Sequence, residues 1–268
     1  MILSLKDNSV WWQVQHYSEL LYVLVVRNLK VRYRGSFLGV YWSLLNPLMM
    51  TGLYGAIFGT VFASYYNNSI INYLMAAFTG LAIINFFSAS TSQSLASVVG
   101  NGALLNKIRL PVSIFPVSTI GANVFQFAVG VLPILEIVTF VKSQSFLNML
   151  ALFLPLLALT FVCTGVGFFV SSLYVFFRDL PYFYELVVFV LGISSPVFYP
   201  PAIVPEKVKL VLNLNPLSPI IESIRQIALS GTVPDLTLIW GALLTSVLVL
   251  VMGWACFHGW RTQFMDLL

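Results

Sequence analysis

The chain has 268 residues, of which 59% are hydrophobic and only 8% are charged. Soluble domains carry roughly a quarter charged residues, so this composition excludes an ordinary soluble globular protein. The formal net charge of +4 comes from 13 lysines and arginines against 9 aspartates and glutamates. Cations this sparse do not make a nucleic-acid-binding surface, so no nucleic-acid partner is expected. The composition predicts an all-α, polytopic membrane protein.

Six apolar stretches reach or approach the roughly 20 residues that a helix needs to cross the hydrocarbon core. In chain order, the predicted spans cover residues 36–63, 73–99, 112–141, 146–176, 183–200 and 236–258. With both termini in the cytoplasm, most lysines and arginines fall in the inner segments, as the positive-inside rule requires. We therefore expect a six-helix transmembrane domain over residues 36–268, behind a cytoplasmic N-terminal segment of residues 1–35.

The N-terminal segment holds a predicted amphipathic helix over residues 13–35. Leucines and valines form an apolar side, and four cations, Arg27, Lys30, Arg32 and Arg34, gather toward its end. This pattern is typical of a helix in the inner membrane interface, with its cations facing phospholipid headgroups. The alternative is that the cations only anchor the first span on the inner side, and both roles are compatible.

Two further segments do not span. Residues 101–111 (NGALLNKIRLP) form a short, apolar, helix-competent piece with two cations, which predicts a cytoplasmic helix that inserts into a groove of a partner. Residues 201–235 are broken by prolines into pieces too short to cross the membrane. A re-entrant helical hairpin on the outer side is expected there, because an ordinary outer loop would hold fewer aliphatic residues.

Catalytic and metal-binding patterns are missing from the sequence. The two histidines, His16 and His258, lie near opposite ends of the chain and lack the spacing of metal ligands. No Gly-Lys dipeptide occurs, so the chain has no nucleotide-binding P-loop. We expect no catalytic residue, no metal and no cofactor in this chain. Energy for any pumping would come from another polypeptide or from an ion gradient.

Aromatic residues suggest a path for a neutral polar substrate. Those at positions 54, 58 and 62 recur every four residues and so share one helix face. Aromatic faces beside hydroxyls and amides suit sugar rings, although interfacial belts and ordinary packing are the alternative. The candidate substrate-path residues are Tyr54, Phe58, Phe62, Phe86, Phe87, Tyr184, Phe198 and Tyr199.

Five motifs, in matching order over almost the whole chain, carry a resemblance to a known family. They are RNLKVRYRGSFLGVYWSLLNPLMM, NKIRLPVSIFPV, VFFRDLPYF, SPVFYPP and LNPLSPIIESIRQI. Together they resemble ABC-2-type permease subunits of bacterial exporters for O-antigen, capsular polysaccharide or teichoic acid. The resemblance implies a homodimer in the bacterial inner membrane, with two separate ABC nucleotide-binding subunits that hold ATP and Mg.

The resemblance also assigns roles to residues. It implies that residues 104–110 are a coupling helix that docks on the ATPase, and that the turn around position 178 is a second contact. The ATPase-coupling residues are then Leu104, Leu105, Asn106, Lys107, Ile108, Arg109, Leu110, Arg178 and Asp179. The expected substrate is an undecaprenyl-diphosphate-linked glycan, whose headgroup would meet the cations of residues 27–34.

The expected function is therefore that of a transport subunit, not an enzyme, which moves lipid-linked polysaccharide and above all O-antigen. An exporter permease for teichoic acid, capsule, a drug or a small lipid is the alternative within the same broad class. A secondary carrier or channel without an ATPase is a second alternative. A membrane-embedded glycan-modifying enzyme fits worst, because the spans hold so few aspartates, glutamates and histidines.

Overall fold

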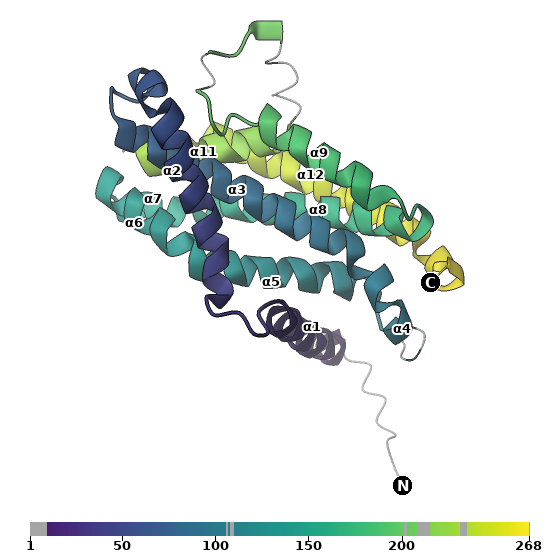
Figure 1. The fold of residues 1–268 in the computed structure, drawn as a ribbon. Coiled ribbons are helices and arrows are strands. Elements are labelled where there is room, and N and C mark those ends of the chain that lie inside the picture. The colour runs from purple at the N-terminus through teal and green to yellow at the C-terminus, as the bar shows by residue number, and fades with distance from the viewer. Residues whose placement is uncertain are drawn as a thin grey trace.

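The structure is a computed structural model that describes residues 10–105, 107, 110–200, 203–207, 209, 215–230 and 235–267. Within those ranges the regular elements are all helices, so the predicted all-α class is confirmed (Figure 1). The longer helices are α1 (Val10–Arg32), α2 (Trp42–Phe62), α3 (Ile70–Ser97), α5 (Ile114–Gly130), α6 (Leu132–Ser143), α8 (Phe153–Phe176), α9 (Leu180–Ser194), α11 (Leu217–Leu229) and α12 (Leu236–Trp260). The short ones are η1 (Gly39–Tyr41), η2 (Ala63–Tyr65), η3 (Val99–Asn101), α4 (Gly102–Leu105), α7 (Phe146–Ala151), η5 (Arg261–Gln263) and α13 (Phe264–Leu267).

Four helical stretches of the described chain are long and apolar enough to cross a membrane. They are Gly39–Tyr65, Ile70–Ser97, Phe146–Phe176 and Leu236–Gln263. The pair α5 and α6 makes a fifth span if it is counted as one helix bent by 45°. The chain is thus a multi-pass membrane protein, while the count of six spans stays a prediction.

Prolines explain two differences from the predicted spans. The third span was expected to be continuous over 112–141, but Pro133 in the first turn of α6 cannot donate a backbone N–H, and the helix bends there. The fifth was expected over 183–200. Instead α9 has 15 residues and ends at Ser194, because the residue before Pro196 is disfavoured in a helical conformation.

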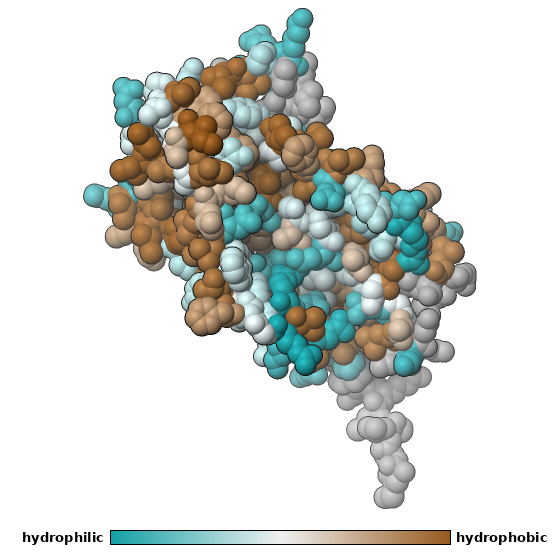
Figure 2. Space-filling model, in the orientation of Figure 1, coloured by the Kyte–Doolittle hydropathy of each residue, from teal (hydrophilic) through white to brown (hydrophobic). Residues whose placement is uncertain are grey.

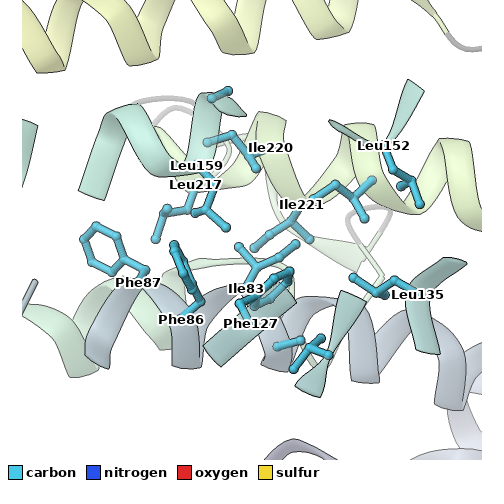
Figure 3. Close-up of a cluster of buried hydrophobic side chains, with 14 of the residues drawn as sticks. Ile83, Phe86, Phe87, Phe127, Leu135, Leu152, Leu159, Leu217, Ile220 and Ile221 are labelled. Carbon is cyan, nitrogen blue, oxygen red and sulfur yellow. The ribbon is translucent and has the colours of Figure 1, made fainter. Parts of the chain in front are cut away.

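The main hydrophobic core joins α3, α5, α8 and α11 (Figure 3). The apolar side of α11 is fully buried there through Ile220, Ile221, Ile224 and Ile227. This helix belongs to the predicted outer segment 201–235, of which residues 201–202, 208, 210–214 and 231–234 lie outside the described residues. Its burial shows that α11 is an integral part of the bundle. Whether the segment is re-entrant stays a prediction.

A second core packs segments that were predicted to be cytoplasmic against the ends of predicted spans. It contains Leu24 of α1, Leu105 of α4, Phe115 of α5, Val175 of α8 and Phe264 of α13. Figure 1 likewise shows α1, α4 and α13 toward one end of the bundle. The predicted interface helix and the predicted coupling segment therefore share one packed cluster.

Helices α8 and α12 form the most extensive helix pair of the described chain. They meet at Gly165 and Gly253, where no side chain separates the two backbones. A Cβ atom at Gly253 would lie only 1.9 Å from the carbonyl oxygen of Gly165, and one at Gly165 would lie 2.4 Å from that of Val249. Small residues of this kind allow transmembrane helices to approach closely.

Candidate transport site

The predicted interface helix is present as α1. Its apolar side packs on α5 and the second core through Leu24, with Tyr17, Leu20 and Leu21 partly buried around it. The helix ends at Arg32, and Gly35 follows with a φ of +77°, a conformation that glycine adopts without a steric penalty. The chain turns there and enters η1 and α2. The helical fold of this segment is thus confirmed, and its place in the membrane interface stays a prediction.

The four predicted headgroup cations divide into two groups. Lys30 and Arg34 are exposed, and so is Arg27, whose Nη2 donates a hydrogen bond of 2.8 Å to Asn101 Oδ1. Arg32 is only partly exposed and turns back toward α3 and α5. Three of the four cations are therefore placed to meet an external anion directly, whereas Arg32 faces the side chains of α3 and α5.

Arg32 is held by three amide side chains. Its Nη1 donates hydrogen bonds of 3.0 Å to Asn123 Oδ1 and 2.5 Å to Gln126 Oε1, and its Nη2 donates one to Gln93 Oε1. Asn123 Nδ2 in turn donates to Gln93 Oε1 at 3.0 Å. We call Arg32, Gln93, Asn123 and Gln126 the amide cluster. The acceptors are neutral amide oxygens, so the amide cluster supplies no counter-charge to the guanidinium.

Two cavities meet at Arg32. One, of about 640 Å³, is lined by Arg27, Asn28, Val31, Arg32, Gln93 and Thr119. The other, of about 440 Å³, lies between α3, α5 and the start of α2, and we call it the inner cavity. Besides Arg32, its polar and aromatic lining consists of Tyr33, Trp42, Ser43, Asn46, Asn85, Phe86, Ser88, Asn123, Gln126 and Phe127.

The lining of the inner cavity has a specific chemistry. Among the described residues that line it, Arg32 is the one that is charged, and amides, hydroxyls and aromatic rings make up most of the rest. Figure 2 shows hydrophilic side chains gathered between the apolar surface of α2 and the end that holds α1. Amides and hydroxyls bind neutral polar groups, and rings cover apolar C–H faces. The inner cavity therefore suits a sugar next to an anionic group.

The aromatic residues predicted on one face of α2 form a stacked row. Ring centroids lie 6.0 Å apart for Tyr54 and Phe58 and 5.9 Å apart for Phe58 and Phe62. Phe198 continues the row, with its ring centroid 3.9 Å from that of Tyr54. Tyr73, which sequence reasoning missed, packs beside Phe62 at 5.8 Å. We call these five residues the aromatic row.

The other predicted path residues lie elsewhere. Phe86 and Phe87 are buried in the main core, and Tyr184 is buried in a smaller cluster. Phe86 also forms part of the wall of the inner cavity and packs edge-on against Phe127 at 5.2 Å. Tyr199 donates hydrogen bonds of 3.2 Å to the carbonyl oxygens of Ile193 and Ser194. The assignment of these residues to a substrate path stays a prediction.

The predicted coupling segment is described in part. Helix α4 covers Gly102–Leu105, and Leu105 is buried in the second core, with Leu104 and Leu110 packed against it. Lys107 is exposed. The predicted contacts Asn106, Ile108 and Arg109 lie outside the described residues. The leucines expected to meet a partner are therefore used, at least in part, to fix the segment to the bundle.

The second predicted contact is the turn between α8 and α9, where Arg178 and Asp179 are both exposed. Arg178 Nη2 donates a hydrogen bond of 3.3 Å to the carbonyl oxygen of Leu267, and its guanidinium carbon lies 5.7 Å from the ring centroid of Tyr174. Phe176, just before the turn, packs against the second core. Both predicted ATPase contacts thus adjoin the same packed cluster.

These observations define a multi-pass helical membrane protein with a polar cavity that Arg32 lines and a stacked aromatic row. Residues 19–229 match the ABC-2 type transporter family, and the chain belongs to that family. The sequence-based resemblance is thereby confirmed. Membership makes the chain a transport subunit and implies an ABC ATPase as its partner.

Curated relatives cover nearly the same length. The chain is 30% identical over 252 residues to an O-antigen export system permease protein RfbA of Klebsiella pneumoniae, an alignment that covers 93% of this chain and 95% of the relative. A second Klebsiella pneumoniae protein of that name is 29% identical over the same shares. A Myxococcus xanthus protein of that name is 28% identical over 95% of this chain and 97% of its own length.

Proposed function

We propose that this chain is the permease subunit of an ATP-driven exporter that moves lipid-linked polysaccharide, with O-antigen as the first candidate, across the bacterial inner membrane. It would work as a homodimer, with both termini in the cytoplasm and two copies of an ABC ATPase below it. One observation carries the proposal: relatives named as O-antigen export permeases are 28–30% identical along at least 93% of this chain.

The structure supports a route for the force. An ATPase that closes on ATP would push on the α4 segment and on the turn at Arg178. Both adjoin the second core, which also contains the apolar side of α1 and the start of α5. Since close-packed groups do not deform independently, a push on α4 would shift α1 and with it Arg32.

The same geometry supports a route for the substrate. An undecaprenyl-diphosphate headgroup would first meet Arg27, Lys30 and Arg34 on the exposed side of α1, because cations suit a pyrophosphate. Arg32 lies behind them, where a diphosphate would compete with the amide cluster for its guanidinium. The first sugar would then lie at the inner cavity, and the aromatic row would offer stacking faces further along.

Reconstitution tests this function. The chain and its ABC ATPase in proteoliposomes should move lipid-linked polysaccharide only when ATP is present, and that substrate should stimulate ATP hydrolysis. Transport by the purified chain alone would make it a secondary carrier. Stimulation by a drug or a small lipid, without any by the glycan, would place it among the other exporters.

Charge reversal at Lys107 should uncouple the ATPase. Lys107 is exposed on the predicted docking segment, and like-charge contacts across an interface cost several kcal/mol. Lys107→Glu should therefore reduce co-purification of the ATPase about tenfold or more. Lys209→Glu, an exposed change on the predicted outer side, is the matched control and should leave the complex intact. Equal recovery of the ATPase with both variants would remove Lys107 from the interface.

Neutralising the exposed cations of α1 should weaken headgroup recognition. Each lysine or arginine near an anionic surface contributes about 1 kcal/mol, so Lys30→Gln with Arg34→Gln should raise the half-maximal substrate concentration for ATPase stimulation roughly tenfold or more. Assembly with the ATPase should not change. Lys207→Gln serves as the control, and an unaltered half-maximal concentration in the α1 variant would exclude the headgroup role.

A further inference from the structure

Arg225 has an unusual set of partners. It lies on α11 between isoleucines of the main core and is only partly exposed. Its guanidinium donates hydrogen bonds to three main-chain carbonyl oxygens: to Ala76 from Nε at 3.0 Å and from Nη2 at 2.9 Å, to Pro196 from Nη1 at 2.5 Å, and to Val197 from Nη2 at 2.8 Å. These acceptors are neutral, so the bonds fix backbone in place without neutralising a charge.

The carbonyls belong to two different parts of the chain. Ala76 is in α3, whereas Pro196 and Val197 follow α9 in irregular backbone, whose carbonyls have no helical partners. Gly80, one turn after Ala76, leaves the necessary space: a Cβ there would lie 3.0 Å from Arg225 Nη2 and 3.1 Å from Val197 Cα. Arg225 thus joins three separate elements, namely α11, α3 and the segment after α9.

The segment after α9 also carries one member of the aromatic row. The carbonyl oxygen of Phe198 accepts a hydrogen bond of 3.2 Å from Tyr73 Oη, and its ring stacks on that of Tyr54. At the start of the segment, Asn215 Nδ2 donates a hydrogen bond of 2.9 Å to Ser195 Oγ. Residues 196–199 are therefore bound to α11 through Arg225 and present Phe198 to α2.

We propose that Arg225 is a positioning residue that fixes residues 196–199 on α3 and thereby holds the Phe198 ring against Tyr54 in the aromatic row. The consequence of this positioning for export rests on the proposed function. The role needs a planar fork with donors in fixed directions, because one side chain must reach Ala76, Pro196 and Val197 at once. A lysine at this position keeps the charge and loses the fork.

The contact of Arg225 with residues 196–199 is tested without any transport assay. The measurement is amide hydrogen exchange on the full chain with its ATPase in nanodiscs. Opening the segment should accelerate exchange in peptides covering 195–200 about tenfold in Arg225→Lys, since charge-assisted hydrogen bonds contribute about 1.5–3 kcal/mol. Gly80→Ser should do the same by displacing the guanidinium. Gly241→Ala is the control, because a Cβ at that position of α12 has no other atom within 4 Å. Unchanged exchange in Arg225→Lys and Gly80→Ser would overturn the proposal.

A double-mutant cycle tests the link to the aromatic row. If Arg225 acts through Phe198, Arg225→Lys should slow export about tenfold when Phe198 is present and less than about twofold in a Phe198→Ala background. Equal losses in both backgrounds would show that Arg225 acts independently of Phe198. Failure of the wild-type complex to export glycan would refute the proposed function. The exchange experiment would still show whether Arg225 fixes residues 196–199.

Discussion

Replacing Gly253 with valine is expected to prevent the chain from accumulating as folded protein. A Cβ atom there would lie 1.9 Å from the carbonyl oxygen and 2.8 Å from the Cα atom of Gly165. These are backbone atoms, which cannot rotate away as a side chain can, so α8 and α12 would have to separate. Overpacking costs about 1–3 kcal/mol even where side chains absorb it, and a larger loss is expected here.

The measurements are the yield of monodisperse protein in detergent and the midpoint of thermal unfolding. Gly241→Ala and Gly259→Ala on the same helix are matched controls, because a Cβ at either position has no other atom within 4 Å. Alanine inside a helix is more favourable than glycine by roughly 0.5–1 kcal/mol, so these variants should be neutral or slightly stabilised. A Gly253→Val protein with a normal midpoint would show that α8 and α12 do not meet at these glycines.

Replacing Arg32 with alanine is expected to reduce glycan export at least about tenfold, because the loss combines two effects. The amide oxygens of Gln93, Asn123 and Gln126 lose a charged donor in a partly buried site, at a cost of about 1–3 kcal/mol. The cation shared by both cavities is also removed. Export in proteoliposomes and the thermal midpoint should both fall.

Two further variants separate these effects. Arg32→Lys keeps the charge but offers one ammonium in place of two separated Nη donors, so we expect an intermediate loss of export. Lys30→Ala removes an exposed cation from the same helix and should leave the thermal midpoint unchanged. Wild-type export and stability in Arg32→Ala would exclude a role for the amide cluster.

Much of the fold follows from the sequence because its signals are local. The long apolar stretches, the helix before them and the shared face of Tyr54, Phe58 and Phe62 all depend on composition or helical periodicity, and the structure contains them. The span limits were less accurate, since proline effects such as the bend at Pro133 and the end of α9 depend on single residues. Family membership could be predicted from the sequence because five motifs occur in the order that the family has.

The partners of the two inward-turned arginines could not be predicted. The pattern of α1 places Arg32 beside the other cations, and only the packing of α1 on α5 brings it to Asn123 and Gln126. The available signal for such partners was a polar residue within an apolar stretch. The third predicted span holds two such amides, Asn123 and Gln126. Arg225 was still harder, because its acceptors are backbone atoms that leave no trace in the side-chain pattern.

The chemistry of those acceptors has a consequence for how the protein could be driven. Amide and peptide oxygens do not take up protons at any pH that a bacterium experiences, so acidity on either side of the membrane cannot release Arg32 or Arg225 from the partners described above. Displacement of these oxygens, or competition from an anion, can loosen the two arginines.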